Sequence, residues 1–153
     1  MTTNQYVFIN SHACSVINGG YDIDLGFDSN RPPLLTIEVI SANVETTTEY
    51  SLLNLRCDLA ASNSYQNDQY PACLGTIVYA GQNSLTTTET YMMTSTEQPK
   101  LVISNIRKFT IQFILPTGAK VLIDDIISFT LMFKLTYPKP LDISTEYRSQ
   151  IPL

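Results

Sequence analysis

Residues 128–137 read SFTLMFKLTY, and apolar side chains recur there at every second position. The apolar positions are Phe129, Leu131, Phe133, Leu135 and Tyr137. The positions between them are Thr130, Met132, Lys134 and Thr136. Because successive side chains of a β-strand point to opposite faces, this alternation predicts a strand with one face buried in a core.

A second alternating stretch lies just upstream, at residues 108–115, where Phe109, Ile111 and Phe113 are separated by polar side chains. Residues 116–118 (PTG) then supply turn chemistry, because proline and glycine favour tight turns. We expect a short strand at 120–123. The adjacent acidic pair at 124 and 125 is interpreted as a turn between that strand and the long one.

The first part of the chain holds further strand patterns. Residues 35–40 alternate, and prolines at 32 and 33 mark the start, since proline cannot donate to a sheet ladder. The other predicted strands are 6–9, 15–17, 50–59, 73–80, 89–94 and 100–106. The polar segment between residues 60 and 71 is expected to be a loop. GQN at 81–83 is expected to end the strand that begins at 73.

Short strands between turn signals, with no convincing amphipathic helix, predict an all-β fold. The spacing favours a single antiparallel jelly-roll β-sandwich of about eight strands, with extended terminal arms. We divide the chain into an N-terminal arm with the first strands (1–33), a jelly-roll core (34–137) and an extended C-terminal tail (138–153). Prolines in the tail oppose a helix there.

The chain has few charges, 15% of its 153 residues, with a net charge of −5. Its nine Lys and Arg residues form no basic stripe, which argues against direct nucleic-acid binding and against an anionic membrane surface. Neither a signal-peptide pattern nor an apolar run long enough to span a membrane is present. Threonine runs at 46–48 and 86–88 are typical of a neutral polar surface that can lie against copies of itself without desolvating many charges.

Three cysteines, Cys14, Cys57 and Cys73, are too few and too widely spaced for a disulfide framework or a zinc site. We interpret them as buried free thiols in a protein kept in a reducing compartment. His12 is the single histidine, so a cage of several imidazoles is excluded. A His12–Cys14 pair would share one face of a strand, but a reactive thiol also needs an orienting third group.

The densest acidic segment is residues 22–30 (DIDLGFDSN), whose alternate oxygens are a candidate Ca²⁺ site, although the spacing is not that of an EF-hand loop. Gly19, Gly20 and Gly26 do not form a phosphate-binding loop. We therefore predict no catalytic residues, no cofactor and no metal site. An enzyme on a β scaffold would require a pocket where several ionisable groups converge.

One series of segments is more specific than the composition. It comprises LNLRCDL at 53–59, a polar loop, PACLGTIVY at 71–79, ISNIRKFTI at 103–111, LPTG at 115–118 and FTLMF at 129–133. This series resembles the small single-jelly-roll capsid proteins of large icosahedral DNA viruses with an internal membrane, namely the nucleocytoplasmic group and their virophage relatives. The resemblance covers about residues 34–137 and includes no catalytic motif.

The resemblance implies a structural virion protein assembled in the host cytoplasm, either a penton at five-fold vertices or a minor capsid protein. Its partners would be the major capsid protein, minor capsid proteins and copies of itself, five of them in a penton. Shells close when one surface patch meets a different patch on the next copy. Terminal arms, above all the tail from residue 138, would add a strand to a neighbour's sheet edge.

An alternative is a jelly-roll module that binds receptors or carbohydrate, as in spike heads and lectins. Its candidate sugar-stacking residues are Tyr65, Tyr70, Tyr79 and Tyr91, while the lack of tryptophan argues against it. A secreted structural domain is disfavoured by the free cysteines and by the missing signal-peptide pattern.

Overall fold

The computed structural model describes residues 2–26, 34–59, 72–93, 99–104 and 108–138. Within these ranges the chain forms ten strands and two 3₁₀ turns, which confirms the predicted all-β class. The strands are β1 (Thr2–Asn10), β2 (Ser15–Ile17), β3 (Gly20–Asp24), β4 (Leu34–Thr46), β5 (Leu52–Cys57), β6 (Ala72–Asn83), β7 (Thr88–Met92), β8 (Leu101–Ser104), β9 (Lys108–Ile114) and β10 (Ile126–Pro138). The 3₁₀ turns are η1 (Ser11–Ala13) and η2 (Ile123–Asp125).

The strand order is that of a jelly roll. One layer has the order β1-β10-β4-β8 and the other β2-β3-β9-β5-β6, with every described pair antiparallel. β7 pairs with both β4 and β6 and joins the two layers at one end. Without β2 and β7, eight strands remain in two interleaved Greek keys, which is the jelly-roll topology.

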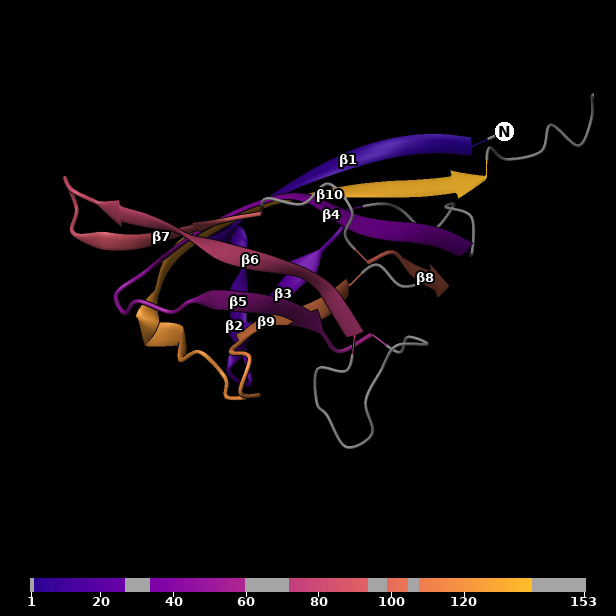
Figure 1. The fold of residues 1–153 in the computed structure, drawn as a ribbon. Helices are drawn as coiled ribbons and strands as arrows, with labels where there is room; N and C mark the ends of the chain where they lie inside the picture. The colour runs from indigo at the N-terminus through magenta and orange to yellow at the C-terminus, as the bar shows by residue number, and fades with distance from the viewer. Residues whose placement is uncertain (1, 27–33, 60–71, 94–98, 105–107, 139–153) are drawn as a thin grey trace, which may run out of the picture.

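Figure 1 shows how the layers lie. β1, β10 and β4 run together along the upper side, while β5, β9 and β3 form the lower side. β6 and β7 extend away from the body as a two-stranded ribbon at one end. The strand order ends at β1 in the upper layer and at the short strand β2 in the lower layer, so each of these strands has one free edge among the described strands.

The core fills the space between the layers, and β10 contributes its predicted apolar face. Phe129, Leu131, Phe133 and Leu135 are each at most 1% exposed, as the alternation predicts. The aromatic rings of Tyr21 and Phe129 meet edge to face, with centroids 4.7 Å apart, so a side chain of β3 contacts one of β10 across the sandwich. The side chain of Tyr137 lies outside the described part.

A buried tyrosine fixes the corner between β4 and β5. The Tyr91 hydroxyl accepts a hydrogen bond from the Tyr50 N–H at 2.8 Å and donates one to the Thr48 carbonyl at 3.0 Å. The Thr46 hydroxyl donates to the same carbonyl at 2.6 Å. These hydrogen bonds join the Tyr91 side chain to the backbone of residues 48 and 50, and so they hold the turn at the junction of the two layers.

Two local predictions are wrong, and one strand is not predicted. Residues 120–123 form no strand: Lys120 makes an isolated bridge with Ile114, and the chain then enters η2. Residues 81–83 do not end the strand that precedes them, because β6 continues to Asn83 and Gly81 sits at a register shift with φ +117°. Glycine alone tolerates that backbone conformation without strain, and it allows the ribbon to bend and continue.

The third difference concerns residues 20–24, for which no strand is predicted and whose last three residues belong to the acidic segment 22–30. They form β3, whose Tyr21 and Ile23 are buried and which pairs with β9. Thus β1 and β3 belong to the two layers of the jelly roll, and the described core begins before residue 34. The loop at 60–71 and the tail after 138 lie outside the described residues.

The two faces of β10 predict opposite mutational effects. We expect Phe133→Ala to lower the free energy of unfolding by about 3–5 kcal/mol, because it removes a fully buried ring and leaves a cavity. Its neighbour Met132 lies on the outer face and is half-buried, so Met132→Ala should cost less, about 1 kcal/mol. Urea unfolding measures both. Equal losses at the two positions would contradict the assigned faces.

The buried thiol of Cys57 predicts a loss of stability at alkaline pH. Burial raises the pKa of Cys57 from 9.0 to about 12. Between these values the native state keeps a proton that the unfolded state has lost, so the free energy of unfolding falls as pH rises, by up to about 1.4 kcal/mol per pH unit.

Chemical denaturation at several pH values between 8 and about 10 measures this slope, below the range where Tyr21, also raised to about 12, adds to it. Cys57→Ala should show a shallower decline than the parent chain. The same slope in both proteins would refute the assignment to Cys57.

Candidate interaction surface

Apolar side chains gather on the outer face of the β1-β10-β4-β8 layer. Five of the large apolar residues exposed in the described chain lie on this face or on its continuation in β7: Tyr6, Phe8, Ile40, Met92 and Val102. Scattered exposed apolar residues are ordinary, but a group on one sheet face indicates a contact surface. We call Tyr6, Phe8 and Ile40, together with the half-buried Met132 on the same face, the outer patch.

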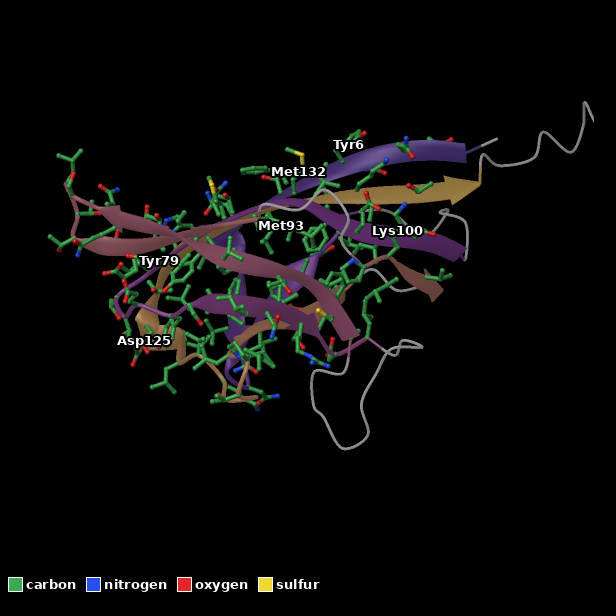
Figure 2. All side chains as sticks on the ribbon, in the orientation of Figure 1. Tyr6, Tyr79, Met93, Lys100, Asp125 and Met132 are labelled. Atoms are coloured by element: carbon green, nitrogen blue, oxygen red, sulfur yellow. The ribbon has the colours of Figure 1, made fainter. Side chains whose placement is uncertain are left out.

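Strand register brings the outer patch together. Phe8 lies opposite Met132, and Met132 lies opposite Ser41, so three strands present these positions side by side. Figure 2 shows Tyr6 and Met132 projecting from the same side of the sheet. A register shift between Met132 and Phe133 makes Ile40 an extra residue in β4, and its side chain is 40% exposed.

Charged residues border the outer patch on one side. Tyr6 lies opposite Lys134, which lies opposite Glu38. The Lys100 Nζ is 3.5 Å from a Glu38 carboxylate oxygen, and Figure 2 places Lys100 at the β8 side of the layer. The arrangement is an apolar centre with a mixed-sign polar border, as in a protein–protein interface with a polar rim.

Next to the outer patch, a groove of about 350 Å³ opens between the free edges of the two layers. Phe8 and Ile9 line it from β1, and Asp22, Asp24 and Lys108 line it from β3 and β9. Asp24 and Lys108 are register partners in adjacent strands. The groove therefore has an apolar wall from one layer and a charged wall from the other.

Cys14 lines this groove, and its surroundings favour the protonated thiol over the thiolate. Burial and the nearby charge of Asp22 raise the pKa of Cys14. Its Sγ lies 3.5 Å from the Asn10 carbonyl oxygen. His12 is exposed in η1, where its backbone N–H donates to the Asn10 side chain. His12 and Cys14 therefore do not share a strand face, because His12 lies in the 3₁₀ turn between β1 and β2.

The other two cysteines are also free. Cys57 is fully buried in the core, as interpreted from the sequence, whereas Cys73 is only half-buried on β6. Cys57 lies in β5 and Cys73 in β6, and β9 separates these two strands from β3 in the lower layer. Cys14 is thus the one cysteine that lines the groove.

The acidic segment that suggested a Ca²⁺ site is divided by the fold. Asp22 and Asp24 belong to β3, and the Asp24 carboxylate accepts a hydrogen bond from the Gly26 N–H at 2.8 Å. Residues 27–30 lie outside the described ranges. In the part of the chain that the structure describes, no group of three or more acidic, cysteine or histidine side chains is placed to hold a metal ion.

Two of the four candidate sugar-stacking tyrosines, Tyr79 and Tyr91, lie in the part of the chain that the structure describes. Tyr91 is 1% exposed and its hydroxyl is used inside the β4–β5 corner, so its ring cannot contact a ligand. Tyr79 packs edge to face on Tyr91 and donates a hydrogen bond to Glu89. Tyr65 and Tyr70 lie outside the described residues. The assignment of Tyr91 to a carbohydrate site is therefore wrong.

The sequence did not identify Tyr6 and Phe8 as exposed on one sheet face, or Phe8 and Cys14 as lining one groove. The signal available was the strand-like run at 6–9, which contains no charge. Among the described residues, no helix is long and apolar enough to cross a lipid bilayer. No protein-family model and no curated protein matches the chain.

Proposed function

We propose that this chain is a structural subunit of a protein shell, a capsid building block of the single-jelly-roll kind that its sequence resembles. It acts as a penton at five-fold vertices or as a minor capsid protein, through contacts with its own copies and with other capsid proteins. It would be assembled in the host cytoplasm and reside in the virion. The observation that carries the proposal is an apolar patch, bordered by charged residues, on the outer sheet face of a jelly roll.

The fold suits this role because the two layers are tied across a continuous core. The ring of Phe129 in β10 meets those of Tyr21 in β3 and Phe113 in β9 edge to face, with centroids 4.7 and 5.4 Å apart, so these contacts join strands of opposite layers. A densely packed interior resists deformation, so each subunit can present its surface patches at fixed angles. Fixed angles are what a closed ring or shell of identical subunits requires.

The outer patch supplies the attraction that such contacts need. Tyr6 is 56% exposed and Phe8 is 61% exposed, so burying them against a partner removes apolar surface from water. A fully buried aromatic or aliphatic side chain contributes about 1.5–3 kcal/mol, and no charge lies among the residues of the patch. β1 itself carries no charged side chain, so copies can approach along it without like-charge repulsion.

Native mass in solution tests the proposal. We expect the purified chain to form a species whose mass is a whole multiple of 17.1 kDa, with five copies for a penton. The double substitution Tyr6→Lys with Phe8→Lys should convert it to monomer, because two charges would be buried at the contact. Circular dichroism and urea unfolding should remain close to the parent, since both side chains are exposed.

Leu85→Lys with Leu122→Lys is the matched control, because Leu85 is 94% and Leu122 is 69% exposed and neither belongs to the outer patch. This control should keep the parent mass. A parent chain that is monomeric at every concentration, or a Tyr6/Phe8 variant that assembles like the parent, would contradict the proposal.

A further inference from the structure

The charged wall of the groove carries more negative than positive charge. Asp22 and Asp24 lie two residues apart on β3, with the buried Ile23 between them, so both carboxylates face away from the core. Lys108, from β9, is the one cation among the residues that line the groove. Two carboxylates and one amine leave a surplus of one negative charge in a space of about 350 Å³.

The surplus charge is that of Asp22. The Asp24 carboxylate accepts a backbone hydrogen bond at 2.8 Å, and the register partner of Asp24 in β9 is Lys108. Asp22 instead lies opposite Thr110 in β9 and Ser15 in β2, and neither of these side chains carries a charge. Asp22 is only half-buried and lines the groove, so a ligand there can reach its carboxylate.

The wall on the β1 side is apolar. Phe8 and Ile9 form this wall, and Phe8 is 61% exposed, so it has surface left to bury against a ligand. Cys14 also lines the groove, and its raised pKa keeps the thiol neutral near pH 7, so it adds no charge to that of Asp22. The groove therefore combines an unbalanced carboxylate with an apolar wall.

This lining favours one class of ligand. An anion would meet the surplus negative charge, and a purely apolar ligand would remove water from Asp22 without replacing its hydrogen bonds, which is costly. An ammonium or guanidinium group on an alkyl stem suits both walls, because the cation forms charge-assisted hydrogen bonds with a carboxylate while the stem lies on apolar side chains. The groove also has the volume of a small-molecule site, for which about 300–1,000 Å³ is typical.

We infer that the groove binds an organic cation, an ammonium or guanidinium group on an alkyl stem, with Asp22 as its counter-ion and Phe8 and Ile9 along the stem. The cation is a free small molecule or the end of a lysine or arginine side chain, and both sources offer the same chemistry to the groove. This inference adds a ligand site to the proposed structural role and does not require that copies of the chain assemble.

Ligand-observed NMR with the full-length chain tests the inference. The probes are n-butylguanidinium and n-butylurea, which have similar shapes and the same stem but differ in charge. We expect butylguanidinium to bind at least about tenfold more tightly than butylurea, because the cation alone pairs with the carboxylate. Methylguanidinium, which lacks most of the stem, should bind severalfold more weakly than butylguanidinium, since each buried methylene contributes to affinity.

Two substitutions that remove the same charge localise the site. Asp22→Asn should weaken the binding of butylguanidinium about tenfold and leave that of butylurea unchanged. Asp124→Asn is the matched control, because Asp124 is exposed in η2 and does not line the groove, so it should bind both probes as the parent does. Phe8→Ser should reduce the affinity for butylguanidinium but not for methylguanidinium. Circular dichroism checks that each variant keeps the β fold.

A blocked arginine, N-acetylarginine methylamide, separates the two sources of the cation. Binding at least as tight as that of butylguanidinium assigns the groove to a basic side chain, and clearly weaker binding assigns it to a free cation. Equal affinities for butylguanidinium and butylurea, or no binding of either, would overturn the inference. Equal losses in Asp22→Asn and Asp124→Asn would overturn it too. The native mass remains the separate test of the proposed function, so a chain that assembles without binding the cation loses only this site.

Discussion

The two-sided hydrogen bonding of β10 is the constraint on which the rest of the structure depends. This strand pairs with β1 on one side and β4 on the other along most of its thirteen residues. Its inner face places Phe129, Leu131 and Phe133 in the core, so a slip of one residue would expose all three. The same register determines that Met132 and Phe8 face outward together. Core and contact surface are therefore set by a single pairing.

Alternation made β10, β4, β5 and β9 predictable from the sequence, because each has an apolar face that packs against the core. The failures have a different origin. β3 contains two aspartates, and its burial depends on pairing with β9, which lies far away in sequence and is not encoded locally. Residues 120–123 have strand-like composition, but with only the Lys120–Ile114 bridge for support they lack a partner strand along their length. Pairing over long sequence distances decided both cases.

The candidate surface was less predictable than the fold, for a related reason. Whether a strand is central or at an edge depends on topology, and the run at residues 6–9 reads the same in either position. Only the structure shows that Tyr6 and Phe8 are exposed while Val7 and Ile9 are half-buried beside a groove. The composition did indicate a surface with few charges, but composition describes the chain as a whole. It could not indicate on which side of the sandwich the apolar residues gather.

The distribution of acidic groups adds a reason why contacts would form along the β1 side. Glu89 accepts a hydrogen bond from Tyr79, and Glu45 accepts one from Thr88, both in the region of the β6–β7 ribbon. Asp125 accepts hydrogen bonds from Tyr50 and Thr47 nearby, and Figure 2 places Tyr79 and Asp125 at the end of the molecule away from Tyr6. Copies with a net charge of −5 repel one another, but less so when their acidic ends are far apart. A contact through the uncharged strand β1 would keep these ends apart while burying the outer patch, and the acidic groups nearest to it would be Asp22 and Asp24, which line the groove together with Lys108.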